Sequence, residues 1–131
     1  MLQMGSIVNC VDNTGVIKVK VIQVLGYGVI RHAKIGDRVV VSVVKLNNKA
    51  IFLSDERKRK RFKKGSLHRG IILHTKSRFF RKDQTILWFK ENALVLVDKN
   101  GVPIAKKINV GIPREVVSKY PGIASLCFKI F

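Results

Sequence analysis

Apolar and polar residues alternate along large parts of the chain with a period of two, the pattern of a β-strand that is buried on one face. The alternation is clearest from Val16 to Leu25, and a run rich in β-branched residues extends from Asp37 to Leu46. Continuous apolar runs extend from Leu67 to His74 and from Ala93 to Val97, and a shorter run covers Ile7 to Val11. We therefore predict a strand in each of these segments.

Turn and helix signals separate these runs. Turns are predicted at Asp12–Gly15 and Asp98–Gly101, because Asp and Asn hydrogen-bond to their own backbone and Gly allows a positive φ. Thr75 to Gln84 is expected to form the tip of a hairpin, with Thr85 to Phe89 as its returning strand. Near the C-terminus, Pro113 suits the first turn of a short helix that reaches Lys119.

Short, regularly spaced strands with turns between them indicate a mainly β fold, and we predict a small closed barrel. Closing the sheet removes the open edges that would make so many Val and Ile residues prone to aggregation. A chain of 131 residues is long enough for one domain with a core. We find no internal repeat and no linker, so residues 1–131 are predicted to be a single domain with a basic loop insertion at about residues 47–66.

The net charge of the chain limits the classes of partner that it can bind. The chain carries 26 Lys and Arg residues against 8 Asp and Glu residues, a formal net charge of +18. A compact domain with this imbalance repels itself unless a polyanion compensates it, and nucleic acid is the usual polyanion because neutralised phosphates release counterions. An anionic membrane surface would instead require a basic amphipathic helix or a lipidation signal. Neither is found, since Cys127 lies one place too far in for prenylation, and we expect no membrane partner.

The densest charge is a block of consecutive cations near the middle of the chain. Such a block cannot pack in a core. It is either a solvated charge run or, as we predict for a domain that is basic throughout, an arm that binds phosphates. The candidate RNA-binding residues here are Arg57, Lys58, Arg59, Lys60 and Arg61, followed by Lys63 and Lys64.

A second candidate segment lies at the predicted hairpin tip, where cations flank two adjacent aromatic residues. Splayed RNA bases can stack on such aromatics while the cations hold phosphates. Alternatively, Phe79 or Phe80 folds back and plugs one end of the barrel. The candidate residues of this segment are Lys76, Arg78, Phe79, Phe80, Arg81 and Lys82.

A further basic patch near the predicted helix consists of Lys106, Lys107 and Arg114. Arg114 can instead form a local ion pair with Glu115, which would contribute little to stability if it is exposed.

The chain offers no set of residues for catalysis. His32, His68 and His74 lack the spacing of metal ligands and are expected at the surface or facing RNA. Cys10 and Cys127 are expected to be small buried hydrophobes in a reducing compartment. The carboxylates are scattered mainly at turns, and there is no nucleophile elbow or Walker loop. We therefore predict no enzymatic activity, no cofactor and no metal site.

Taken in order, these segments resemble the universal large-subunit ribosomal protein conventionally numbered fourteen. Val11–Gly15 is similar to that family's V/A-D-N-[ST]-G turn, and Ile35-Gly36-Asp37 is similar to the V-G-D before its next strand. The family's most specific stretch is a Gly with three aliphatics, a basic hairpin, an aromatic, an Asn and a Val-rich strand, and it corresponds to residues 70–96. Arg114-Glu115 matches an R-E pair near the end, so the resemblance covers nearly the whole chain.

Two departures from the family pattern bear on the site. Gln84 stands where the family normally has Gly, so the hairpin turn is expected to be wider or of another type. The loop between Leu46 and Lys63 is longer than in bacterial members, and the partner of its Arg57–Arg61 block cannot be carried over from the family.

The resemblance implies a five-stranded antiparallel β-barrel with a protruding β-ribbon hairpin and short C-terminal helices. It also implies binding to large-subunit rRNA near the subunit interface and to small-subunit rRNA at an intersubunit bridge. The implied protein partners are neighbouring large-subunit proteins, in particular the one numbered nineteen, and a ribosome-silencing factor.

The function expected from the sequence is thus a structural part of the large ribosomal subunit. The alternative is a free barrel-type translation factor or RNA chaperone. No targeting segment is visible, and residues with AT-rich codons outnumber those with GC-rich codons. We expect a mitochondrial, organelle-encoded ribosomal protein, with a bacterial cytoplasm or a plastid as the alternative location.

Overall fold

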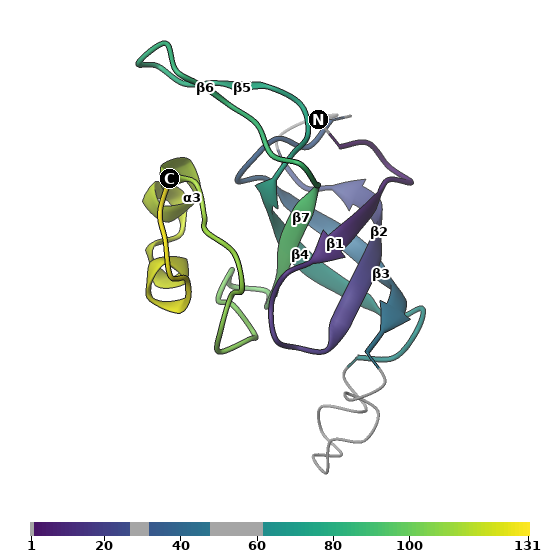
Figure 1. Cartoon of the computed structure of the whole chain (residues 1–131). Helices are drawn as coiled ribbons and strands as arrows, with labels where there is room; N and C mark the ends of the chain where they lie inside the picture. The colour runs from purple at the N-terminus through teal and green to yellow at the C-terminus, as the bar shows by residue number, and fades with distance from the viewer. Residues whose placement is uncertain (1, 27–31, 48–61) are drawn as a thin grey trace.

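A closed barrel of five strands forms the centre of the computed structural model, which describes residues 2–26, 32–47 and 62–131 (Figure 1). All the strands predicted for the barrel are present, and the last two have the predicted bounds. In spatial order they are β1 (Ile7–Cys10), β2 (Val16–Val24), β3 (Arg38–Leu46), β4 (Leu67–His74) and β7 (Ala93–Val97).

Neighbouring strands pair antiparallel except where the barrel closes. There β1 and β7 are parallel, with Asn9 opposite Ala93. The prediction of an antiparallel barrel therefore needs a correction at this one pair. The reason is that the barrel has an odd number of strands. If direction alternates from strand to strand around a ring of five, the first and the last strand run in the same direction.

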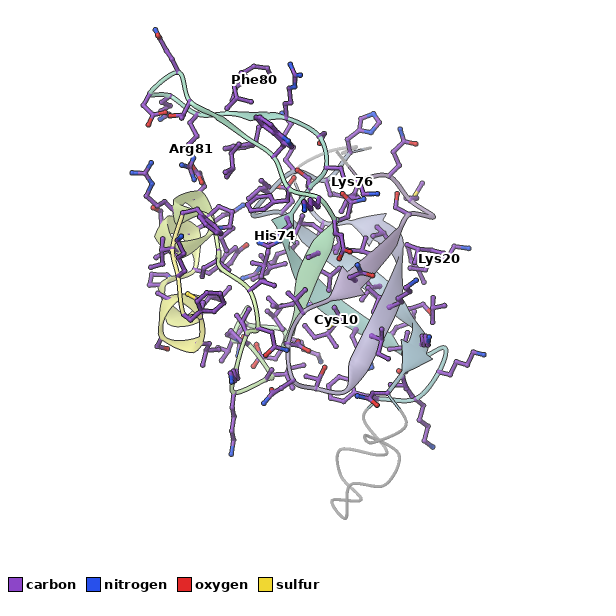
Figure 2. The ribbon with its side chains drawn as sticks, viewed as in Figure 1. Cys10, Lys20, His74, Lys76, Phe80 and Arg81 are labelled. Carbon is purple, nitrogen blue, oxygen red and sulfur yellow. The ribbon has the colours of Figure 1, made fainter. Side chains whose placement is uncertain are left out.

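The barrel interior follows from the period of two in β2 and β3. Val19, Val21, Val39 and Val41 are fully buried in the first core cluster, whereas Lys20 points outward. Figure 2 shows Lys20 projecting from the outer side of the barrel. Fully burying a valine side chain stabilises the fold by about 1.5–3 kcal/mol, so this alternation fixes which face of each strand points inward.

The strands β4 and β7 are buried on both faces, which explains why their sequences are continuously apolar. Their outer faces form a second core cluster that includes Ile71 and Val95. The C-terminal segment covers this cluster with the helix α3 (Arg114–Lys119) and the 3₁₀ helix η1 (Pro121–Leu126), which lie beside the barrel in Figure 1. The predicted short helix is confirmed, with Pro113 as its N-cap.

The Asp12 carboxylate joins the first turn to β7. Its Oδ2 accepts a hydrogen bond from the backbone N–H of Leu96 at 3.0 Å, and its Oδ1 accepts bonds from the backbone N–H and the hydroxyl of Thr14. The Cys10 thiol donates to the same Oδ1 at 3.1 Å. Burial and the neighbouring Asp12 carboxylate raise the pKa of the Cys10 thiol, so this cysteine is a poor nucleophile.

A β-ribbon leaves the barrel between β4 and β7 and extends over α3 (Figure 1). It consists of β5 (Phe79–Phe80) and β6 (Ile86–Leu87). Its turn is tight, because the N–H of Gln84 donates to the carbonyl of Arg81 at 3.1 Å. Gln84 has a φ of 67° and is the one non-glycine residue with a positive φ in the described ranges. The sequence left open a wider turn or a turn of another type; the wider turn is absent, and Gln84 itself adopts the left-handed conformation.

Candidate nucleic-acid interface

The two faces of the ribbon have different environments. Phe79 lies opposite Leu87, and both pack against the second core cluster. Phe80 lies opposite Ile86 on the other face and is 71% exposed. Figure 2 shows Phe80 pointing away from α3. Phe79 therefore folds back onto the protein, where it packs against the outer face of the barrel and does not plug its end. Phe80 remains exposed and free to stack on a base.

Arg81 turns toward the protein and not toward solvent. Its side chain is only 10% exposed, and its Nε lies 2.7 Å from Oε1 of Glu115 in α3. Its Nη2 donates to Oε2 of Glu115 at 3.2 Å and to the carbonyl oxygen of Phe131 at 2.7 Å. Arg81 was predicted to bind RNA, but its guanidinium is committed to these contacts, which hold the ribbon against the C-terminal segment.

Arg114 does not pair with its neighbour Glu115, because Glu115 is engaged by Arg81. The local ion pair considered from the sequence is therefore wrong. Arg114 instead lies at the surface, with its Nη2 3.8 Å from Oδ2 of Asp83 in the ribbon turn. At that distance its guanidinium is still open to a phosphate.

His74 lies at the base of the ribbon and is half-buried. Its ring stacks on Phe89 with the centroids 3.9 Å apart, and its Nε2–H donates to the carbonyl of Gly111 at 2.7 Å. Desolvation lowers its pKa. The expectation of a surface or RNA-facing histidine is wrong for His74, because the C-terminal segment covers this end of β4 in a way that a strand pattern cannot reveal.

Exposed cations lie at both ends of the barrel. The ribbon, which follows β4, carries Lys76, Arg78 and Lys82 at one end. Lys63 and Lys64 precede β4 and so lie at the other end. The backbone N–H of Lys106 bonds to Asn13 in the β1–β2 turn, which places Lys106 and its neighbour Lys107 at that end as well. The Arg57–Arg61 block lies outside the described residues.

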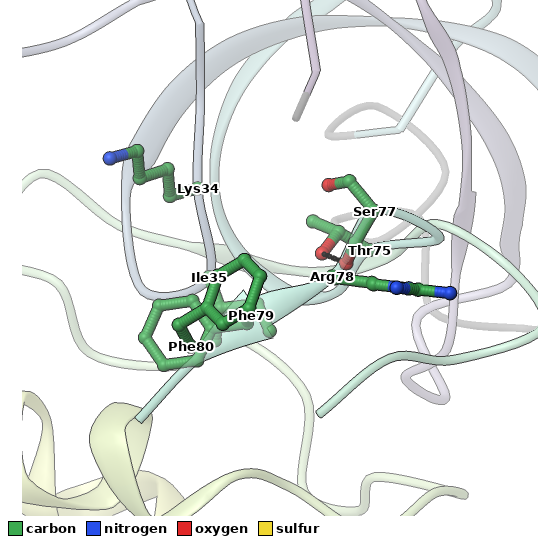
Figure 3. Close-up of a pocket in the computed structure, with 7 residues that line it drawn as sticks. All are labelled: Lys34, Ile35, Thr75, Ser77, Arg78, Phe79 and Phe80. Atoms are coloured by element: carbon green, nitrogen blue, oxygen red, sulfur yellow. Dashed lines mark hydrogen bonds between the residues drawn. The ribbon is translucent and has the colours of Figure 1, made fainter. Parts of the chain in front are cut away.

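A cleft with a volume of about 340 Å³ lies beside the base of the ribbon (Figure 3). Its walls bring together residues from the ribbon and from the turn that precedes β3. Sequence reasoning missed Lys34 and Ile35 of that turn, because no local signal connects them to a hairpin some forty positions away. The lining residues are Lys34, Ile35, Thr75, Ser77, Arg78, Phe79 and Phe80.

Trp88 is a further exposed residue that the sequence reasoning did not include among the site residues. Its side chain is 60% exposed. Trp88 lies two positions after Ile86, the cross-strand neighbour of Phe80, so the alternation of side chains along the strand puts it on the same face. The Arg78 guanidinium lies over its ring, with Cζ 6.0 Å from the centroid. Reading the period of two through the returning strand would have placed Trp88 on the same face as Phe80.

Features of other site classes are missing from the described part of the chain. Across residues 2–26, 32–47 and 62–131, His, Cys, Asp and Glu never come together in a group of three or more that could hold a metal ion. Within the same ranges, no helix is both long and apolar enough to cross a membrane.

The fold and the site define a small basic β-barrel protein with exposed cations at both ends and a projecting ribbon. Comparison with known proteins makes this specific: the chain belongs to the ribosomal protein L14p/L23e family, whose family model matches residues 1–131. It is 33% identical over 120 residues to the large ribosomal subunit protein uL14m of Neurospora crassa, covering 91% of this chain and 90% of that protein. The resemblance seen in the sequence is thus confirmed. The protein is a structural component of the large ribosomal subunit and not an enzyme.

Proposed function

We propose that the protein binds large-subunit rRNA near the subunit interface and holds rRNA segments together as a rigid platform. The main support for this proposal is that exposed cations lie at both ends of one closed barrel. Cations on a rigid body neutralise phosphates without loss of loop entropy and release counterions from the RNA. The proposed contact residues are Lys63, Lys64, Lys76, Arg78, Lys82, Lys106, Lys107 and Arg114.

The ribbon is proposed to reach small-subunit rRNA at an intersubunit bridge. It projects beyond the barrel, and its contacts with α3 fix its direction. The Arg57–Arg61 block is proposed as a further phosphate-binding arm. Neighbouring large-subunit proteins, among them the one numbered nineteen, and a ribosome-silencing factor remain the partners that the family resemblance suggests.

Sedimentation tests the proposal. Ribosomes are washed at high salt and separated on a sucrose gradient, and the protein is followed with an antibody. We expect it to stay with the large subunit after the wash. Release into the top fractions would favour the alternative, a translation factor or RNA chaperone that exchanges on and off the ribosome.

The proposed location is the mitochondrial ribosome. The similarity to uL14m and the excess of residues with AT-rich codons support it. Identifying the genome that encodes the chain, together with fractionation of ribosomes from that cell, tests this location. Recovery in cytoplasmic or plastid ribosomes would contradict it.

A further inference from the structure

We propose that the cleft beside Phe80 receives a single unpaired base of rRNA, so that the ribbon recognises a flipped-out nucleotide and not only phosphates. This inference rests on the proposed function, because it requires the protein to lie on rRNA. It adds a base-binding site to a surface otherwise explained by charge.

The walls of the cleft are suited to a planar, weakly polar ring. Phe79 and Ile35 form the inner part and are anchored in the second core cluster. Phe80 forms the outer wall, and its high exposure leaves its aromatic face available. Figure 3 shows these three side chains gathered together. The cleft of about 340 Å³ lies at the small end of the range for small-molecule pockets, which suits a base better than a bulky ligand.

The charges at the rim select a nucleotide over an apolar protein segment. Figure 3 shows Lys34 on one side of the apolar walls and Arg78 on the other, and none of the described residues that line this cleft is a carboxylate. A base that enters between them brings its two flanking phosphates toward cations. A second cleft of about 440 Å³, on the α3 side of the ribbon, is lined by Asp83 and Glu115 as well as by Arg81, Lys82 and Arg114, so carboxylates offset part of its positive charge. The distribution of carboxylates therefore favours the first cleft.

Both walls of the cleft are held before any ligand binds. The turn that carries Lys34 and Ile35 is closed by a bond from the Lys34 N–H to Oδ2 of Asp37 at 2.8 Å. It is fixed to β4 by a bond from the Gly36 N–H to the carbonyl of Ile72 at 2.8 Å. Trp88 orients Arg78 through its ring. A preformed cleft avoids the entropy cost of ordering its walls on binding.

Two matched RNA hairpins test the proposal with the full chain. One carries a single bulged purine, and the other is the same hairpin without that base. We expect the bulged hairpin to bind more tightly by roughly five- to a hundredfold, the range of one base stacked on an aromatic side chain. Phe80→Leu, which keeps an apolar side chain but removes the ring, should abolish this preference, and Phe80→Tyr should keep it.

Ile86→Ala is the control, because Ile86 is the cross-strand neighbour of Phe80 but does not line the cleft. It should leave the preference unchanged, whereas Lys34→Ser should weaken binding to both hairpins. Equal affinity of the unaltered chain for the two hairpins, or a preference that survives in Phe80→Leu, would overturn the base site. Failure of the unaltered chain to bind either hairpin would instead overturn the proposed RNA binding itself.

Discussion

The Nε of Arg81 lies 2.7 Å from Oε1 of Glu115, and this contact ties the ribbon turn to the start of α3. The two residues are far apart in sequence, and their side chains are 10% and 32% exposed. The Nη2 of Arg81 donates to Oε2 of Glu115 and to the carbonyl oxygen of Phe131, so the C-terminal segment is held at the same point. Arg81 therefore does not face solvent, where it could bind a phosphate. It instead fixes the direction in which the ribbon presents its other cations.

Glu115→Gln should destabilise the fold, because it leaves the mostly buried guanidinium of Arg81 without its counter-charge. We expect a loss of about 1–3 kcal/mol in the free energy of unfolding, measured by urea titration. Arg114→Gln is the matched control, since it removes the exposed pair with Asp83. The control should change stability by no more than about 1 kcal/mol. Equal effects of the two changes would contradict a structural role for Arg81.

Asp12→Ala should be more damaging than its position in a turn suggests. It removes the acceptor of the buried Leu96 N–H and of two Thr14 donors. Hydrogen bonds to a charged group stabilise by about 1.5–3 kcal/mol, so we expect a loss of roughly 2–3 kcal/mol. Thr14→Val removes only the hydroxyl bond and should destabilise less. Urea titrations of both variants give the comparison, and a larger loss for Thr14→Val would refute this role of Asp12.

Gln84→Gly should stabilise the protein, which is unusual for a change to glycine. Gln84 holds a left-handed backbone conformation that costs an ordinary residue about 1–2 kcal/mol. Glycine relieves this strain but adds about 0.4–1 kcal/mol of unfolded-state entropy. The expected net gain is about 0.5 kcal/mol, visible as a higher midpoint of thermal unfolding. Gln84→Ala retains the strain and should give no gain, so a gain of equal size in that variant would point to another cause.

The part of the fold that could be predicted is the part that local patterns encode. Alternation revealed the faces of β2, a run of β-branched residues located β3, and turn chemistry located Asp12–Gly15. Segments that pack together from distant parts of the chain left no such trace. The carboxylate that turns Arg81 inward lies in α3, and the turn with Lys34 that completes the cleft precedes β3. Tertiary contacts, and not local propensity, therefore decided which predicted site residues are exposed.

The stability of the fold should fall as the pH drops below about 6.5, and His74 is the reason. Desolvation lowers the pKa of this histidine from its ordinary value of 6.5, so the unfolded chain takes up a proton more readily than the folded protein. Neutral His74 contributes its full share of the folding stability above the pKa that it has in the unfolded chain. This contribution is lost as the pH falls toward the lower pKa that it has in the folded protein. Asp83, whose pKa is lowered mainly by its hydrogen bonds with Thr85, stays ionised throughout this window. Urea titrations between about pH 7.5 and 5.5 should therefore show a smaller pH dependence in His74→Gln than in the unaltered protein. An unchanged pH dependence in that variant would exclude His74 as the titrating group.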